Sequence, residues 1–399
     1  MDIQIFPGKL NGIIQAIPSK SQAHRILICA AFADRPTMLI CPQTNEDIEA
    51  TADCLRALGA NITRTQNGYH VLPSKEIPTS ATLNCRESGS TLRFMLPVAA
   101  ALGVDATFLL SGRLPQRPLS PLWEEMERMG CNLTRPTETT IRCEGRLKAG
   151  RYIIDGGISS QFITGLLLAL SLIPERSQIE ITGKLESAPY VEMTQKVLSL
   201  FGSVTEGFNI TGRLPFQSVG DIAVEGDWSN GAFFLAAKQL GSELRIDGLD
   251  IASAQGDRAC ITIMDALSKS HTTVDCADIP DLVPILSVVA ASFHGATFNG
   301  IERLRLKESD RVCAVINMLG AMGIHAEATN HTLHVFPGSF SGGTVDAVND
   351  HRIAMATAIA ATVSTAPVTI LGAECVKKSY PTFWEEFQRL GGHYEQYVR

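Results

Sequence analysis

Several short stretches of the sequence place cations, hydroxyls or carboxylates directly before an apolar, helix-forming run. The first is SKSQAHR, in which Lys20, Ser21 and Arg25 precede the run ILICAAFA. Arg25 follows Ser21 by one helical turn, so both side chains can reach one oxyanion. A serine cap with two solvated cations explains the same residues. This stretch alone leaves a helix cap and an anion site as alternatives.

The most charged stretch is RLRLKESDR, which includes Lys307, Glu308 and Arg311. Its alternation of cations with leucines predicts a strand whose positive charges face one side. A charge run of this kind is also typical of a solvated face. Asp281 is different, because it is the one charged residue in the apolar stretch IPDLVPI. A carboxylate in such a setting is either a helix cap or a candidate catalytic base.

Other predicted helix starts carry further polar groups. In ESGSTLR, Gly89 lies between two serines, where a ligand can approach the backbone closely. In SGRLPQRPL, Arg117 belongs to a Pro-rich loop. Each stretch alone is explained by a turn, a cap or a surface loop, but their recurrence at equivalent helix starts favours a ligand site. The other polar residues at such positions are Ser159, Ser160, Gln161, Tyr190, Arg352 and Lys378.

These stretches belong to a repeat. A polar tip followed by an apolar helix recurs six times, and each copy is followed by a second, amphipathic helix. Short β-type runs lie between the two helices. Most of the second helices end at a glycine suited to a positive φ, and the fourth copy has lost this glycine. These terminal glycines are Gly59, Gly130, Gly202, Gly323 and Gly391.

The repeat predicts the fold class and favours an anionic ligand. Each copy is too large for a solenoid repeat and is typical of a small α+β subdomain. We therefore expect an α/β (α+β) protein with two similar domains of three repeat units each. If the copies pack alike, the helix N-termini within one domain point the same way, and their partial positive charges favour an anion.

Composition limits the other possibilities. The net charge is −7 and the pI about 5.8, which disfavours general nucleic-acid binding. The longest apolar runs are too short to span a bilayer, and the first residues do not form a secretory signal. The ten cysteines include no C-x-x-C pair, so zinc is not expected, and scattered thiols are typical of a reducing cytoplasm. We expect a soluble cytoplasmic protein.

The stretches quoted above, together with RPLSPL, GDWSNGAFFLAA, NDHRIAMA and KKSYP, resemble the 3-phosphoshikimate 1-carboxyvinyltransferase (EPSP synthase) family in order and spacing. The resemblance implies two domains of three βαβαββ units joined by a two-strand hinge. The domains would be residues 1–19 plus 226–399 and residues 20–225, with substrates in the cleft between them. It implies a monomer without metal or organic cofactor, and small-molecule substrates rather than nucleic acid or membrane.

The resemblance also implies a reaction and a site. The enolpyruvyl group of phosphoenolpyruvate would pass to the 5-hydroxyl of shikimate 3-phosphate by addition and elimination, with release of phosphate. Asp281 matches the proton acceptor, Glu308 the donor to C3, and Lys20 an assisting group. Phosphoenolpyruvate would contact Lys20, Gly89, Arg117, Gln161, Arg311, Arg352 and Lys378. Shikimate 3-phosphate would contact Lys20, Ser21, Arg25, Ser159, Ser160, Gln161, Tyr190, Asp281 and Lys307.

Three other readings compete with this one. UDP-N-acetylglucosamine enolpyruvyl transferase shares the donor, but that family has a Cys on the loop corresponding to SGRLPQRP, where this chain has none. RNA 3′-phosphate cyclase is built from related units, and the acidic pI argues against it. A non-catalytic phosphate-binding homologue is expected to lose Asp281, Glu308 or one of the clustered arginines, and this chain retains them.

Overall fold

The computed structural model describes residues 1–212 and 214–397 and consists of two compact units, each with its own hydrophobic core. The contiguous unit is Pro18–Glu225. The discontinuous unit is Met1–Ile17 together with Gly226–Arg399. The chain therefore passes between the units twice, after Ile17 and after Glu225.

The contiguous unit contains three four-stranded sheets with the orders β14-β3-β5-β4, β6-β7-β9-β8 and β10-β11-β13-β12. In each sheet the first two strands are parallel and the other pairs are antiparallel, as βαβαββ connectivity requires. Its elements are α1 (Lys20–Ala31), β3 (Thr37–Ile40), α2 (Glu46–Ala57), β4 (Asn61–Thr65), β5 (Gly68–Leu72), β6 (Ser80–Arg86), α3 (Gly89–Leu102), β7 (Asp105–Leu110), the 3-10 helix η1 (Leu114–Gln116), α4 (Leu122–Arg128), β8 (Cys131–Thr137), β9 (Thr140–Gly145), β10 (Arg151–Asp155), α5 (Ser160–Leu170), β11 (Arg176–Thr182), α6 (Ala188–Leu200), β12 (Val204–Glu206), β13 (Asn209–Thr211) and β14 (Asp221–Ala223).

The discontinuous unit contains two four-stranded sheets, β16-β17-β19-β18 and β20-β21-β1-β22, and the two-stranded sheet β15-β2. Strand β1 lies between β21 and β22 and is antiparallel to both. Its elements are β1 (Asp2–Phe6), β2 (Asn11–Gln15), α7 (Trp228–Gln239), β15 (Glu243–Asp247), η2 (Gly256–Ala259), α8 (Cys260–Leu267), β16 (Thr272–Asp275), α9 (Val283–Ser292), β17 (Ala296–Asn299), η3 (Glu302–Leu306), α10 (Arg311–Ala321), β18 (Ala326–Ala328), β19 (Thr332–Val335), β20 (Gly343–Asp346), α11 (His351–Ala361), β21 (Val368–Leu371), η4 (Ala373–Lys378), α12 (Phe383–Arg389) and β22 (His393–Tyr397).

The mixed α/β fold class is confirmed, with one repeat shorter than the others. The fourth repeat consists of β2, α7, β15 and α8, and it lacks the closing hairpin among the described residues. Helix α8 ends at Leu267 and β16 of the next repeat begins at Thr272, so the connection is too short for two strands. This is the repeat whose terminal glycine is missing.

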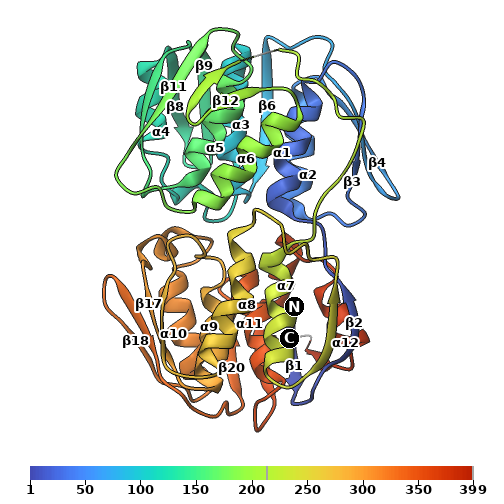
Figure 1. Ribbon diagram of the computed structural model, residues 1–399, viewed down its shortest axis with the longest axis vertical. Coiled ribbons are helices and arrows are strands. Elements are labelled where there is room, and N and C mark those ends of the chain that lie inside the picture. Colours follow the sequence, from blue (N-terminus) through green and yellow to red (C-terminus); the bar gives the residue numbers. More distant parts are fainter. Residues whose placement is uncertain (213, 398–399) are drawn as a thin grey trace. The chain divides into compact units, whose positions relative to one another are not determined.

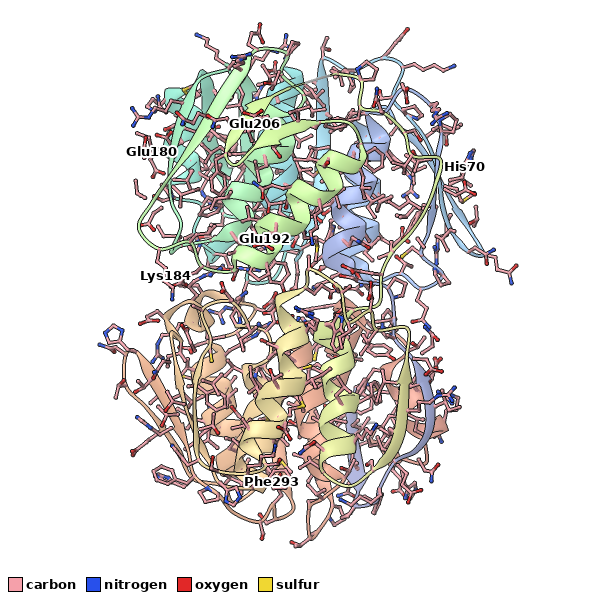
Figure 2. All side chains as sticks on the ribbon, in the orientation of Figure 1. His70, Glu180, Lys184, Glu192, Glu206 and Phe293 are labelled. Atoms are coloured by element: carbon pink, nitrogen blue, oxygen red, sulfur yellow. The ribbon has the colours of Figure 1, made fainter. Side chains whose placement is uncertain are left out.

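In each unit the first helix of every repeat is buried almost all round, which explains its apolar sequence. Helices α1, α3 and α5 pack against one another in the contiguous unit, and α7, α9 and α11 do so in the discontinuous unit (Figure 1). The strands carry charged residues that are at least partly exposed: Figure 2 labels the half-buried Glu180 on β11 and the exposed Glu206 on β12. The glycines predicted to end the second helices all have positive φ. Among the described residues, no helix has both the length and the apolarity to cross a membrane.

The strand predicted for RLRLK is wrong. Residues Glu302–Leu306 form the 3-10 helix η3. Ile301 and Leu304 are fully buried, whereas Leu306 is 47% exposed. Burial thus follows the three-residue period of a 3-10 turn rather than the two-residue alternation of a strand.

Candidate active site

In the contiguous unit, side-chain hydrogen bonds connect the first two turns of five helices. Gln161 Nε2 of α5 donates to Ser90 Oγ of α3 at 3.0 Å. Thr51 of α2 connects α3 to α1 through its hydroxyl. Arg25 of α1 connects to α6, because its Nε donates to Thr194 Oγ1 at 2.8 Å. The N-termini of these helices therefore lie together, and their partial positive charges favour an anion there.

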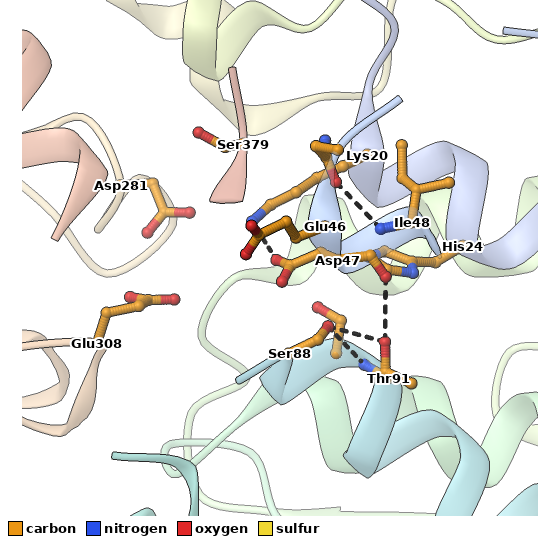
Figure 3. Close-up of polar contacts among 12 residues, drawn as sticks. Lys20, His24, Glu46, Asp47, Ile48, Ser88, Thr91, Asp281, Glu308 and Ser379 are labelled. Atoms are coloured by element: carbon orange, nitrogen blue, oxygen red, sulfur yellow. Dashed lines mark hydrogen bonds and ion pairs between the residues drawn. The ribbon is translucent and has the colours of Figure 1, made fainter. Parts of the chain in front are cut away.

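Lys20 is the first residue of α1, after the N-cap Ser19. Its Nζ lies 2.7 Å from Asp47 Oδ2, in the first turn of α2 (Figure 3). Both side chains are largely buried, with 15% and 16% of their surface exposed. An ion pair this sheltered holds the ammonium in one position more firmly than a solvated pair would.

Arg25 is buried and its guanidinium is surrounded by acceptors. In addition to Thr194, it donates to Thr164 Oγ1 at 3.2 Å, to the Tyr190 carbonyl at 2.9 Å and to the Ser21 carbonyl. Burial lowers the pKa of Arg25 to about 10, which leaves it charged at neutral pH. The sequence prediction that Arg25 and Ser21 lie one turn apart on one helix is met by this geometry.

The start of α3 leaves no room for a side chain at Gly89. A Cβ at this position would lie 2.6 Å from Arg117 Nη1 and 2.8 Å from Arg93 Nη1. Two guanidinium groups therefore approach the helix N-terminus directly. The Glu87 side chain crosses the backbone at Gly112, where a Cβ would overlap its carboxylate.

The remaining predicted residues of this unit lie at α5 and α6. Ser159 is the N-cap of α5 and accepts from the Gln161 backbone N–H at 3.3 Å, and Ser160 is buried in the first turn. Tyr190 lies in the first turn of α6, where its carbonyl accepts from Arg25. Gln161 thus connects α5 to the Gly89 region, while Tyr190 connects α6 to Arg25.

The discontinuous unit contains a second cluster, centred on the buried guanidinium of Arg311. Its Nη1 lies 2.6 Å from Asp281 Oδ1, its Nη2 2.6 Å from Glu308 Oε2 and its Nε 2.9 Å from Asp350 Oδ2. Although burial opposes it, these carboxylates raise the pKa of Arg311 well above its ordinary value. Arg311 also lowers the pKa of Asp350 against the effect of burial.

Asp281 contacts three cations. Besides Arg311, its carboxylate lies 3.4 Å from Lys307 Nζ and 3.0 Å from Arg352 Nη2. Three positive partners stabilise the ionised form of this carboxylate. Glu308 instead shares the Arg311 guanidinium with Asp281 and Asp350.

Lys307 and Lys378 complete the predicted residues of this unit. Burial lowers the pKa of Lys307 to about 8, and Arg311 and Arg303 act in the same direction against Asp281. Lys378 Nζ donates to the Asn349 carbonyl at 2.9 Å. Asn349 immediately precedes Asp350, the N-cap of α11, so this contact connects η4 to the start of that helix.

Backbone strain is concentrated at these helix starts. Among the described residues, four non-glycine residues have positive φ, and each lies at or within two residues of an N-cap. A β-branched residue in this region is especially unfavourable. Strain of this kind persists where the surrounding contacts enforce it, typically at functional sites. The four are Arg86 (φ 51°), Ser187 (φ 55°), Val348 (φ 45°) and Asn349 (φ 56°).

The structure thus brings the predicted residues together in two clusters, one in each unit, and adds residues that the sequence prediction missed. Asp47 was missed because an acidic residue in a first helical turn is ordinary. Asp350 lies in the stretch NDHRIAMA but was not assigned to the site. Thr164 and Thr194 are buried hydroxyls in helices, and the sequence pattern singled out neither of them.

A repeated βαβαββ fold whose helix N-termini carry buried cations is typical of proteins with a site suited to small, strongly anionic molecules. Residues 6–387 match the family described as EPSP synthase (3-phosphoshikimate 1-carboxyvinyltransferase). A 3-phosphoshikimate 1-carboxyvinyltransferase of Clostridium kluyveri is 38% identical over 420 residues, covering 99% of this chain and 98% of the relative. One from Clostridium perfringens is also 38% identical, covering 97% and 98%. The chain belongs to the EPSP synthase family, which confirms the resemblance seen in the sequence.

Solved structures show the same fold at lower identity. An EPSP synthase from Acinetobacter baumannii has a TM-score of 0.80 at 24% identity, covering 99% of this chain and 100% of the other. The enolpyruvyl transferase NikO from Streptomyces tendae has a TM-score of 0.76 at 17% identity, covering 100% and 99%. Proteins with only 17–24% sequence identity to this chain therefore share its fold.

Proposed function

We propose that this chain transfers the enolpyruvyl group of phosphoenolpyruvate to the 5-hydroxyl of shikimate 3-phosphate, with Asp281 and Glu308 as its proton acceptor and donor. The observation that carries these roles is the Arg311 cluster, in which one buried guanidinium contacts both carboxylates. Membership of the EPSP synthase family makes the chain a transferase of the shikimate pathway, active in aromatic amino-acid biosynthesis.

The two carboxylates divide the proton transfers. Asp281, ionised beside its three cations, accepts the proton of the 5-hydroxyl as the oxygen attacks C2 of phosphoenolpyruvate. Glu308 gives its proton to C3, which forms the methyl group of a tetrahedral intermediate. A proton then leaves C3 as the C2–O bond to phosphate breaks, and phosphate is released. Lys20 assists proton transfer and stabilises the charge that develops on the phosphate.

Cations and helix N-termini hold the two substrates. Phosphoenolpyruvate carries a carboxylate and a phosphate, which charge-assisted hydrogen bonds from guanidinium groups recognise strongly. We assign its binding to Lys20, Gly89, Arg117, Gln161, Arg311, Arg352 and Lys378. We assign shikimate 3-phosphate to Lys20, Ser21, Arg25, Ser159, Ser160, Gln161, Tyr190, Asp281 and Lys307.

We also propose that the two units act as the two domains expected from the sequence, with both substrates in one cleft, in a cytoplasmic monomer. The ten cysteines are free thiols, which is consistent with a reducing compartment. Small-angle scattering tests the shared site, since both units must close on the substrates to exclude water. No compaction on adding shikimate 3-phosphate with a second-site inhibitor would count against it, and size-exclusion chromatography with light scattering tests the monomer.

Phosphate release tests the reaction itself. We expect phosphate only when phosphoenolpyruvate and shikimate 3-phosphate are both present, and none from Asp281→Asn under the same conditions. A parallel reaction with UDP-N-acetylglucosamine as acceptor is the control for the related activity. Release with that acceptor and none with shikimate 3-phosphate would overturn the proposal.

A further inference from the structure

His24 is a buried imidazole that the proposed reaction does not use. It lies one helical turn after Lys20 on α1 and has no exposed surface. Its Nδ1 lies 2.7 Å from Thr51 Oγ1 of α2, and its ring meets the edge of Phe94 of α3 with 6.2 Å between centroids. Its Nε2 is buried and has no hydrogen-bond partner among the described residues.

A chain of hydroxyls runs from His24 to the two helix starts of the candidate site. Thr51 Oγ1 lies 2.7 Å from Thr91 Oγ1. Thr91 Oγ1 lies in turn 2.8 Å from Ser88 Oγ and 3.3 Å from the Asp47 backbone carbonyl (Figure 3). Ser88 is the N-cap of α3, immediately before Gly89, and Asp47 is the ion-pair partner of Lys20. These hydrogen bonds therefore connect the first two turns of α1 and α2 to the first turn of α3.

The unpaired Nε2 of His24 determines in which direction the hydrogen bonds donate along this series of hydroxyls. A buried N–H without an acceptor is rarer than a buried acceptor without a donor, so the proton belongs on Nδ1 of His24 rather than on Nε2. Nδ1–H then donates to Thr51, and the Thr51 hydroxyl donates to Thr91. The Thr91 hydroxyl has two acceptors, the Asp47 carbonyl and Ser88 Oγ. When the Thr91 hydroxyl donates to Ser88 Oγ, that oxygen accepts from both the Thr91 hydroxyl and the Thr91 backbone N–H, and its own hydrogen remains available for a group at the start of α3.

The imidazole stays neutral, so the direction of the chain does not change with pH. Burial lowers the pKa of His24 to about 3. The nearby Lys20 and Arg25 act in the same direction, and Asp47 opposes them. A neutral ring with one N–H and one bare nitrogen is the form that the hydrogen-bond geometry requires.

We propose that His24 is a positioning residue for the phosphoenolpyruvate side of the reaction. Through Thr51 and Thr91 it fixes the turn that carries Asp47, and with it Lys20, and it orients the Ser88 hydroxyl beside Gly89. This inference rests on the proposed function, and His24 itself contacts neither substrate in it. These hydrogen bonds affect the geometry in which phosphoenolpyruvate binds and protons are transferred, where a small displacement lowers the reaction rate.

Two pairs of substitutions test whether the hydrogen bonds from His24 through Thr51 to Thr91 position the site. His24→Phe keeps the ring volume and removes both nitrogens, and Thr51→Val removes the hydroxyl at constant shape. We expect each to lower kcat/KM for phosphoenolpyruvate about tenfold or more, by displacing Lys20 and the α3 cap. The conservative partners, His24→Asn with an amide at the Nδ1 position and Thr51→Ser, should recover most of the activity. The Kd of shikimate 3-phosphate should rise by a smaller factor, because Lys20 is only one of the groups assigned to that substrate and Arg25 keeps its own partners.

Ser171→Ala is the matched control for lost stability. Ser171 and Ser203 form a buried hydroxyl pair 3.0 Å apart in the same unit, and neither belongs to the candidate site. We expect this variant to lower the Tm while leaving kcat/KM for phosphoenolpyruvate unchanged. Wild-type kcat/KM in His24→Phe and Thr51→Val, or an equal loss in Ser171→Ala, would overturn the proposal.

Nitrogen-15 NMR of the His24 imidazole tests this hydrogen-bond series without any substrate. We expect the shift of a protonated Nδ1 and a bare Nε2 from pH 5 to 8, and loss of the Nδ1–H coupling in Thr51→Val. A proton on Nε2, or titration within this range, would contradict the inference. If the wild-type chain releases no phosphate while the Nδ1–H form is observed, the reaction is wrong and the hydrogen-bond chain stands.

Discussion

Arg311 makes the two proposed proton-transfer groups interdependent. It is almost completely buried and contacts Asp281, Glu308 and Asp350 at once. Removing one carboxylate from such a cluster leaves charge uncompensated in a low-dielectric site. Substitutions that keep the shape and the hydrogen bonds are therefore the informative ones at this position.

Glu308→Gln tests the general acid. The amide keeps a polar group beside Arg311 but carries no transferable proton, so we expect kcat to fall by about 10²–10⁴-fold. Binding of shikimate 3-phosphate, measured by calorimetry, should stay close to that of the wild type. An unchanged kcat with a raised KM would show that Glu308 binds substrate rather than donating a proton.

Lys307 predicts a pH dependence. Its pKa is lowered to about 8, so the ammonium is charged below pH 8 and loses its proton above it. Only the charged form attracts the phosphate of shikimate 3-phosphate, so kcat/KM for this substrate should fall above pH 8, approaching tenfold per pH unit. The measurement is a kcat/KM profile from about pH 6.5 to 9.5.

Lys307→Arg provides the control, because a guanidinium stays charged throughout this range. Its profile should be level where that of the wild type falls. Identical profiles for the two enzymes would show that another group is responsible for the fall.

At the same scale, the sequence identified residues whose chemistry conflicts with their surroundings. Asp281 stands out because it is the one charged residue in an apolar stretch. Asp47 and His24 do not stand out, because an acidic first turn and a histidine in a buried helix are both common. Their importance depends on partners 27 residues away, Lys20 and Thr51, which only the folded chain identifies.

The start of α3 combines a close backbone approach with two arginines. Gly89→Ala would place a methyl group against Arg117 and Arg93, so at least one guanidinium must move. We expect a raised KM for phosphoenolpyruvate with little change in the Kd of shikimate 3-phosphate. Steady-state kinetics and calorimetry measure the two quantities.

Gly320→Ala is the matched control for this substitution. Gly320 lies inside α10, and a Cβ there meets nothing within 4 Å among the described atoms. Alanine favours a helix interior over glycine, so this variant should keep full activity and gain slight stability. If Gly89→Ala and Gly320→Ala have the same KM for phosphoenolpyruvate, a side chain at position 89 does not obstruct binding of this substrate.

Element boundaries were predicted well where glycines and caps mark them. The helices that end at Gly59 and Gly202 are found where the sequence placed them, and both glycines have positive φ. RLRLK was misread because five residues are too few to separate a period of two from a period of three. The exposed Leu306 and the buried Leu304 resolve that ambiguity.

The two units differ in how the chain supplies their strands. The contiguous unit draws every strand from residues 18–225 and has a core of its own. The discontinuous unit takes β1 and β2 from Met1–Ile17, where Ile3 and Ile5 belong to its core. Local sequence patterns cannot reveal such a pairing, since Ile3 meets Ile370 across β1 and β21.

A fragment of residues 18–225 should therefore fold alone. Its length, about 200 residues, is normal for a domain. We expect cooperative thermal unfolding by circular dichroism and dispersed amide signals by NMR. Residues 226–399, without the first 17, should remain incompletely folded, because β22 and β21 lose the strand between them. Non-cooperative unfolding of the first fragment would contradict the independence of its core.

Strand β1 also sets an order of events during translation. It leaves the ribosome before the contiguous unit, yet its partners β21 and β22 are made at the far end of the chain. At about 5–20 residues per second, synthesis of residues 226–399 takes roughly 10–35 s. Throughout that time the contiguous unit can already be folded, while Ile3 and Ile5 remain exposed on a strand that has no partner strands yet. This incompletely synthesised chain is therefore expected to be a substrate for a chaperone that shields short apolar segments near the N-terminus.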